Sequence, residues 1–314
     1  MSSCLGFDTS NYTTSVAVYD TCAPSIRQVK RLLPVKEGSM GLRQSDAVFH
    51  HVRQLPEIME ELFAAGGSAP SCVAASERPQ ETEGSYMPCF LVGCGAAREF
   101  AAAYGLPLYR FTHQQGHVAA ALLGAGRTEL AQTPFLAFHV SGGTTDALLV
   151  HPASETVISC RVVARSLDLK AGQLVDRVGG MLGLPFPAGP ALERLALQAS
   201  GAHRPRPTFK GLDCSLSGVE NQCQHKMAQG EPPEEIARFC LDSILVAVSG
   251  MTERLRTEYG ELPVVYAGGV MSNTLLRQEL EKRFGGLFAP PVYSADNAAG
   301  IAWLGNRKLT EEGR

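Results

Sequence analysis

The chain lacks several features that would place it at once in a class of protein. Its nine cysteines are odd in number and include no Cys-x-x-Cys pair, which argues against a disulfide scaffold and a zinc ribbon. No apolar run approaches the roughly 20 residues that a membrane-spanning helix needs. Residues 1–8 lack the basic run and apolar core of a signal peptide. We therefore expect a cytoplasmic protein with no membrane partner.

A strong excess of positive or negative residues is also absent, with 28 Lys and Arg against 31 Asp and Glu. The formal net charge is −3, so the chain as a whole gives no electrostatic sign of nucleic-acid binding. One local basic segment stands out, and a solvated loop explains it equally well: His203-Arg204-Pro205-Arg206-Pro207 with Lys210. Composition therefore leaves the partner open.

At 314 residues the chain is long enough for about two domains or lobes, and a strand-turn-strand unit occurs twice. The first copy spans 5–19 and the second spans 135–150, each with paired threonines at the start of its second strand. Helical spacing of apolar residues follows the first copy over 45–65 and the second over 172–182. This duplication predicts an α/β fold with two lobes that resembles the actin-like ATPase and sugar-kinase (ASKHA) architecture, in which a nucleotide lies in the cleft between lobes.

We place the first lobe at 1–110, completed by a C-terminal helix at 296–314, and the second lobe at 111–295 with helical insertions. In the second lobe, Pro232 and Pro233 open a long helix. A short buried strand over 262–266 runs into Gly268-Gly269, and Ser272 or Asn273 can cap the helix after it.

Two glycine turns are candidates for binding a nucleotide. Glycine lets backbone N–H groups approach phosphates closely, because it has no Cβ, and a helix N-terminus nearby adds a favourable dipole. Ser141-Gly142-Gly143 is the candidate phosphate turn and Gly268-Gly269 the candidate nucleoside turn. Either pair alone is weak evidence, since β-turns use Gly-Gly constantly.

Two histidines four residues apart, His113 and His117, share one face of a helix and could hold one metal ion. Asp296, from the far end of the chain, could complete an open three-ligand site. The alternative is two helix-face histidines and a helix cap. A zincin-type protease needs glutamate directly after the first histidine, where this chain has Gln114. The pattern therefore gives no support to a peptidase.

Segments along nearly the whole chain resemble the TsaD family, the threonylcarbamoyl transferases that modify the adenosine beside the tRNA anticodon. The matching segments occur in the family's order. They are Leu5-Gly6-Phe7-Asp8-Thr9-Ser10, His113-Gln114-Gln115-Gly116-His117, Val140-Ser141-Gly142-Gly143, Val175-Asp176-Arg177, Leu182-Gly183-Leu184-Pro185 with Pro187-Ala188-Gly189-Pro190, Ser215-Leu216-Ser217-Gly218, Gly268-Gly269-Val270-Met271-Ser272-Asn273 and Asp296-Asn297-Ala298-Ala299.

The resemblance implies a metal-dependent acyl transferase. His113, His117 and Asp296 would hold one divalent ion, iron or zinc. The enzyme would move a threonylcarbamoyl group from threonylcarbamoyl-AMP to the exocyclic amine of the tRNA adenosine, with AMP leaving. TsaB-like and TsaE-like proteins would be its partners. No residue stands out as a general base.

The resemblance also implies a ligand set for the nucleotide, which would be threonylcarbamoyl-adenylate or ATP or AMP. The phosphate side would lie on Ser141, Gly142 and Gly143. The nucleoside and acyl portions would lie on three further residues: Asp176, Gly189 and Asn273.

The chain departs from the family pattern at several positions. Asn11, Tyr12 and Thr13 stand where the family has an acidic pair, and Ser76 to Glu81 replace a Gly-Pro-Gly-rich loop. Four single residues also differ: Thr144 replaces a histidine, Gln115 and Gln173 each replace a glutamate, and Glu220 replaces a lysine.

These departures leave two alternatives beside the tRNA transferase. One is a diverged paralogue, an ATP-dependent carbamoyl transferase that acts on a small molecule or a protein. The other is a nucleotide-binding scaffold of a tRNA-modification complex, which predicts that metal ligands are lost. Since all three ligands are present, the scaffold is the weakest of the three hypotheses.

Overall fold

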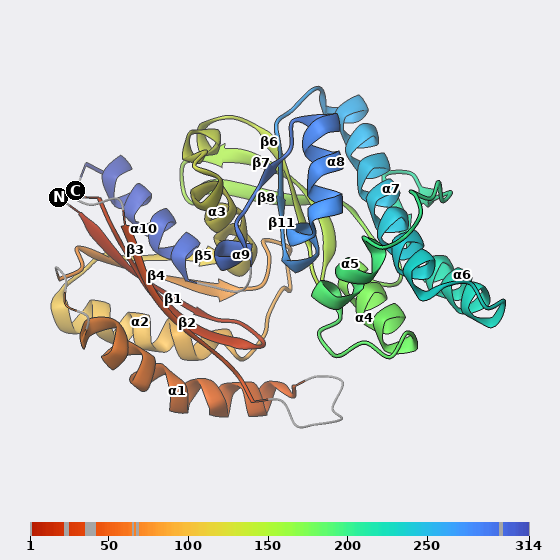
Figure 1. The fold of residues 1–314 in the computed structure, drawn as a ribbon. Coiled ribbons are helices and arrows are strands. Elements are labelled where there is room, and N and C mark those ends of the chain that lie inside the picture. The colour runs from red at the N-terminus through yellow and green to blue at the C-terminus, as the bar shows by residue number, and fades with distance from the viewer. Residues whose placement is uncertain are drawn as a thin grey trace. The chain divides into compact units, whose positions relative to one another are not determined.

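The computed structural model describes residues 2–21, 25–34, 42–64, 66, 69–294 and 298–313. The chain divides into two compact units (Figure 1). Unit 1 comprises Met1–Thr133, His151–Cys160 and Ala295–Arg314, and unit 2 comprises Pro134–Val150 and Arg161–Ser294. The first unit therefore extends beyond residue 110, where the sequence placed the boundary. The reason is that α3 (His113–Ala125) packs against α10 (Ala299–Glu311) within unit 1.

Unit 1 is built on a five-stranded sheet in the order β3-β2-β1-β4-β5. β1 pairs antiparallel with β2, and β2 pairs antiparallel with β3. β4 runs parallel to β1, and β5 runs parallel to β4. The strands are β1 (Ser3–Thr9), β2 (Thr13–Asp20), β3 (Ser25–Leu32), β4 (Cys72–Arg78) and β5 (Leu108–Thr112).

Helices cover both faces of this sheet, as Figure 1 shows. α1 (Gln44–Ala64) and α2 (Phe90–Tyr104) pack on the face where β1 presents Leu5 and Phe7. α10 packs on the opposite face, where a Cβ on Gly6 would lie 2.6 Å from the backbone nitrogen of Ala302. The alternation of side chains along a strand thus buries β1 completely. A short 3-10 helix, η1 (Thr128–Gln132), follows α3.

A second five-stranded sheet, in the order β12-β11-β6-β7-β8, belongs to unit 2 except for the parts of β7 and β8 within residues 151–160, which belong to unit 1. β6 and β7 form the antiparallel hairpin, and β11 and β12 continue the sheet in parallel. Read from the other edge, the order repeats that of unit 1, so the predicted duplication is confirmed. The nucleotide expected between two lobes stays a prediction. The strands are β6 (Phe135–Val140), β7 (Thr145–Ala153), β8 (Val157–Arg165), β11 (Val264–Ala267) and β12 (Leu287–Phe288).

The core of unit 2 lies around α7 (Pro233–Tyr259), whose buried residues include Ile236, Ile244, Met251 and Leu255. The long helix starts at Pro233, as the proline pair predicts. None of the described helices is both long and apolar enough to cross a bilayer. The remaining elements are α4 (Ala171–Met181), α5 (Gly189–Ala196), α6 (Ser217–Ala228), α7 (Pro233–Tyr259), α8 (Thr274–Phe284), α9 (Pro291–Ser294), η2 (Gly269–Ser272) and a small hairpin of β9 (Thr208–Lys210) and β10 (Asp213–Ser215).

One carboxylate organises the start of α6. Asp168 accepts hydrogen bonds from the N–H groups of Leu216 and Ser217, at 2.8 and 3.3 Å, and from the Ser217 hydroxyl at 2.6 Å. Desolvation opposes ionisation, but these donors and the Leu169 N–H outweigh it and hold the pKa of Asp168 below its ordinary value. The Ser-Leu-Ser-Gly segment is therefore ordered by an aspartate about 50 residues upstream.

This carboxylate gives a pH-dependent prediction. Asp168→Asn is expected to lower the free energy of unfolding by about 1 kcal/mol at pH 7, because the helix loses a charged acceptor at its N-terminus. A lowered pKa stabilises the fold above the unfolded value of about 3.9 and ceases to do so as pH falls through the folded value. Urea unfolding from pH 7 to pH 3 should show the two proteins converging below about pH 4. A constant difference would contradict the assignment.

Candidate functional site

Unit 2 contains a pocket of about 530 Å³ that gathers most of the predicted nucleotide-binding residues. Of the six, only Gly143 is not part of its wall, and it directly follows Gly142 in the same turn. The pocket is lined by Ser141, Gly142, Gly172, Val175, Asp176, Pro187, Gly189, Pro190, Glu193, Leu241, Gly269, Val270, Ser272 and Asn273. Segments more than 130 residues apart in the sequence thus line one pocket, and the binding of a nucleotide there stays a prediction.

The phosphate turn joins β6 to β7 and closes on itself. Ser141 donates its N–H to the Thr144 carbonyl at 2.8 Å, while its hydroxyl oxygen accepts from the N–H groups of Gly143 and Thr144 at 3.3 and 3.2 Å. The first turn of α4 lies directly against it, because a Cβ on Gly172 would come within 2.5 Å of the Gly142 nitrogen. The turn is therefore placed beside a helix N-terminus, whose dipole favours an anion.

Thr144 occupies the position where the family has a histidine. Its hydroxyl lies 3.0 Å from the Ser141 hydroxyl and 3.2 Å from Nδ1 of His139. An imidazole is therefore still present beside the turn, supplied by β6 instead of the turn itself. On the next strand, burial raises the pKa of Asp146, and the positive charges of Lys170 and Arg165 oppose the rise.

Asp176 and Gly189 are linked through the loop between α4 and α5. The Asp176 carboxylate accepts the Ala188 N–H at 2.9 Å, which fixes the residue directly before Gly189. Gln173, one turn earlier on α4, accepts the Lys170 N–H at 3.3 Å. On the outer side of α4, Arg177 pairs with Glu220 of α6 at 3.0 Å, which accounts for the acid where the family has lysine.

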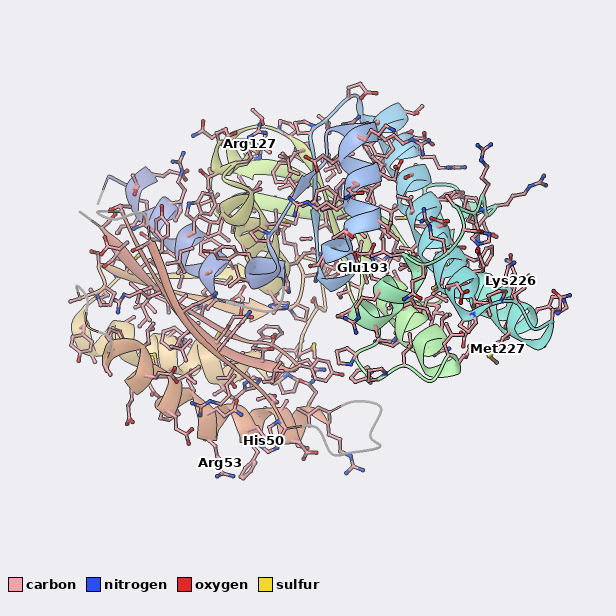
Figure 2. The ribbon with its side chains drawn as sticks, in the orientation of Figure 1. His50, Arg53, Arg127, Glu193, Lys226 and Met227 are labelled. Carbon is pink, nitrogen blue, oxygen red and sulfur yellow. The ribbon has the colours of Figure 1, made fainter. Side chains whose placement is uncertain are left out.

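Asn273 caps α8, as predicted. Its Oδ1 accepts the N–H groups of Leu275 and Leu276 at 3.1 and 3.2 Å. Beside it, Glu193 of α5 accepts the N–H of Thr274 at 2.8 Å and also the hydroxyl of that residue. Figure 2 shows Glu193 between α5 and the start of α8. The sequence analysis missed Glu193, although its place one helical turn after Gly189 was a usable signal.

The predicted metal-binding histidines lie on α3 in unit 1. Thr112 and Gln115 form a capping box, so the helix begins at His113 and places both imidazoles on one face. The two Nε2 atoms are 2.9 Å apart. On the other side of the first ring, Nδ1 lies 3.0 Å from Oδ1 of the fully buried Asp8, which also accepts the Ser76 hydroxyl.

This arrangement fits a metal site in its donor chemistry. A proton on Nδ1 of His113, held by the Asp8 carboxylate, leaves Nε2 with its lone pair, which is the state that a metal ligand requires. Two nitrogens bound to one tetrahedral ion would lie roughly 3.3 Å apart, close to the observed separation. Asp296 lies outside the described residues. Among the residues that are described, no three His, Cys, Asp or Glu side chains are grouped to hold an ion.

Gln115 stands between the two histidines, where the family has glutamate. Its amide nitrogen donates to Glu81 at 2.7 Å and to the Ile158 carbonyl at 2.6 Å, and its oxygen accepts the Thr112 N–H at 2.7 Å. Glu81 in turn accepts from Ser159 and Cys160. The carboxylate at this place is therefore Glu81, from the segment that replaces the Gly-Pro-Gly loop. The Gln115 amide donates the hydrogen bond that this carboxylate accepts.

Gln115→Glu is accordingly expected to lower the free energy of unfolding by about 3 kcal/mol, because the new carboxylate would face Glu81 and a carbonyl with no donor. Adding Glu81→Gln should restore about half of the loss, since one amide then again meets one acid. Urea denaturation of the single and double variants measures both effects. Additive losses would show that the two side chains do not interact.

Comparison with known proteins identifies the family. A family model for TsaD, tRNA N6-adenosine threonylcarbamoyltransferase, matches residues 37–303. A tRNA N6-adenosine threonylcarbamoyltransferase of Methanopyrus kandleri is 29% identical over 310 residues, which cover 96% of this chain and 86% of the relative.

Solved structures agree on the fold. HypF from T. kodakarensis superposes with a TM-score of 0.66 at 13% identity, over 99% of this chain and 48% of HypF. The ROK hexokinase of Thermus thermophilus gives 0.51 at 18% identity, over 98% and 99% of the two chains. At such identities the likeness shows the actin-like ATPase and sugar-kinase fold. The family model covers well over half of the sequence, and the chain therefore belongs to the TsaD family of tRNA N6-adenosine threonylcarbamoyltransferases.

Proposed function

We propose that this transferase binds threonylcarbamoyl-adenylate in the pocket of unit 2 and transfers the threonylcarbamoyl group to N6 of the adenosine beside the tRNA anticodon. The observation that carries the proposal is the convergence of Ser141, Gly142, Asp176, Gly189 and Asn273 on one pocket of about 530 Å³. A volume of this size suits a nucleotide-sized ligand.

In this proposal the adenylate phosphate lies at the phosphate turn. The N–H groups around Gly142 and the first turn of α4 would favour the negative charge there. Asp176 would hold the loop before α5 against the nucleoside, and the amide nitrogen of Asn273, which the α8 cap does not use, would donate to the ligand. Gly143 belongs to the proposed phosphate site. ATP or AMP would bind in the same pocket as alternative ligands.

The transfer forms one bond and breaks one. N6 of adenosine attacks the carbamoyl carbon, the bond from that carbon to the phosphate oxygen breaks, AMP leaves with the electron pair, and N6 loses a proton. Since the leaving group is already activated, most of the catalysis would come from holding the donor in position and from stabilising charge on the phosphate. The phosphate turn is the part of this chain that would do both.

We further propose that His113 and His117 hold a divalent ion, iron or zinc, together with Asp296. Support comes from the two Nε2 atoms 2.9 Å apart and from the buried Asp8 carboxylate behind His113. A bound ion of this kind supplies a Lewis acid for phosphate or acyl oxygens.

A partner protein of the TsaB or TsaE type, in the cytoplasm, is also part of the proposal. An apolar groove of about 710 Å³ lies between α1 and α2, lined among others by Leu55, Met59, Leu91 and Phe100. At its rim the Tyr104 side chain is exposed. An apolar groove that opens to solvent supports a contact with another protein.

Reconstitution tests the proposal. Purified protein, threonylcarbamoyl-adenylate and unmodified tRNA, with and without the partner proteins, should yield threonylcarbamoyl-adenosine that mass spectrometry detects. Asp176→Ala, which removes the acceptor for Ala188, should lower the yield at least about 10-fold. Glu258→Ala, an exposed acid near the end of α7 that belongs neither to the pocket wall nor to the 203–213 hairpin segment, is the control and should stay near wild type. No product with active partners, while nucleotide still binds, would point to a small-molecule or protein acceptor instead.

A further inference from the structure

Residues 203–210 form a segment of unit 2 that we call the cationic arm. Arg204, Arg206, Thr208 and Lys210 are exposed, and they alternate with Pro205, Pro207 and Phe209, which are partly buried. The prolines restrict the residues before them to extended backbone, so the two arginines project from a stiffened segment. Neither the pocket nor the histidine pair involves the arm.

The arm is fixed at both ends. At its start, the His203 N–H donates to Asp242 at 2.6 Å, and the imidazole contacts Glu235 at 3.0 Å. At its end, β9 pairs with β10, and Phe209 packs against Gly250 of α7. The Arg254 guanidinium lies 3.7 Å from the centre of the Phe209 ring. The cations are therefore presented by an anchored segment, which reduces the conformational entropy that binding would cost.

Three acids that contact the arm or lie opposite it in the β9–β10 hairpin already have other partners. Asp242 binds the Arg238 guanidinium at 3.0 Å as well as the arm's own backbone. Glu235 accepts from Ser200 as well as from His203. Asp213 accepts the Arg165 N–H at 2.8 Å. Within the described part of the chain, no ion pair joins Arg204, Arg206 or Lys210 to an acid, so their charges face solvent.

We propose that the cationic arm binds the phosphate backbone of the tRNA substrate. The inference rests on the proposed function, because tRNA is the polyanion that this transferase must hold. In an extended segment, alternate residues lie about 6 Å apart, which is similar to the distance between neighbouring phosphates of one strand. Arginine can grip a phosphate with two N–H groups, and lysine adds a point charge.

An acidic protein is a less suitable occupant. Protein interfaces depend on buried aromatic or aliphatic anchors, and the one aromatic side chain of the arm, Phe209, is turned onto α7. Contacts to phosphate carry no base specificity, so the arm would position the tRNA without reading its sequence. The recognition of the modified adenosine would then rest with the pocket.

The test is binding of an unmodified tRNA transcript, labelled for fluorescence anisotropy, at several salt concentrations. The triple variant Arg204→Ala, Arg206→Ala, Lys210→Ala should bind at least about 10-fold more weakly near 0.15 M salt. A plot of the logarithm of the tRNA association constant against the logarithm of the salt concentration has a negative slope. The magnitude of this slope should decrease by about 2, as expected for the loss of three phosphate contacts to RNA. The double variant Arg204→Lys, Arg206→Lys keeps both positive charges and should bind tRNA with most of the wild-type affinity.

The matched control removes three exposed cations elsewhere: Arg53 on α1, Arg98 on α2 and Lys282 on α8. Arg53 projects from α1 in Figure 2. This control should change the affinity less than about 3-fold. An equal loss in both triple variants would mean that binding follows net charge, and an unchanged arm variant would mean that the arm does not touch tRNA; each overturns the proposal.

Failure of the proposed function gives a different result. If the wild-type protein binds no tRNA and forms no modified adenosine, tRNA is not its substrate, and the proposed role of the arm is rejected as well. If the wild type modifies tRNA and the arm variant binds and modifies tRNA equally well, only the proposal for the arm is rejected. Thermal unfolding of each variant should match wild type within a few degrees, which separates lost contacts from lost fold.

Discussion

His117→Ala is expected to lower bound iron or zinc to below a tenth of the wild-type amount and the transfer rate by at least about 100-fold. His117 is only 5% exposed, and its Nε2 lies 2.9 Å from that of His113. Removing one imidazole leaves a single nitrogen on this face of α3, and one nitrogen binds a divalent ion far more weakly than two. Metal content per chain, measured by mass spectrometry, and the yield of modified adenosine give two independent measurements.

The matched control is His225→Ala, an exposed histidine on α6 that contacts Gln229. It should leave both metal content and yield unchanged. Wild-type metal content in His117→Ala would exclude the histidine pair as the metal site. A loss of metal with unchanged transfer would instead separate the ion from the reaction.

Gly300→Ala is expected to lower the free energy of unfolding by about 3 kcal/mol. A Cβ at this position would lie 1.9 Å from the carbonyl oxygen of Gly116 and 2.7 Å from the nitrogen of Ala120. Both atoms belong to the backbone of α3, so no side chain can rotate away, and α10 must move. Because α3 carries both histidines, metal content should fall together with stability. Urea unfolding measures the first effect and metal analysis the second.

Gly95→Ala is the control for this prediction. Gly95 lies in α2, and a Cβ there would meet nothing within 4 Å. Its replacement should be neutral or stabilising by up to about 1 kcal/mol, because alanine favours a helix over glycine. Equal stability of the two variants would mean that α10 and α3 do not approach as closely as described.

Local pattern alone predicted much of the fold. Helical spacing placed a helix at 45–65, close to the observed Gln44–Ala64, and the proline pair placed the start of α7. The two hairpins and the Asn273 cap were also confirmed. Such features depend on neighbours within a few residues, so a single sequence contains them.

The sequence analysis did not predict several of the strands, among them β3 and β8. β3 contains Arg27, Lys30 and Arg31 and lies at the edge of its sheet, where polar side chains are tolerated and apolar alternation is not required. β8 occupies the corresponding edge in unit 2. An edge strand is stabilised by the hydrogen bonds of its one neighbour, and this neighbour is fixed only when the sheet assembles.

The site divides in the same way. By itself the sequence determined the histidine spacing, the glycine turns and the family, because each is a short or ordered pattern along the chain. Only the tertiary structure decided that His113 lies against Asp8, that Gln115 meets Glu81 and that Glu193 holds Thr274. These pairs join residues 34 to 105 positions apart. Their energies depend on burial and on which strands and helices pack together, and no local pattern of residue types records that.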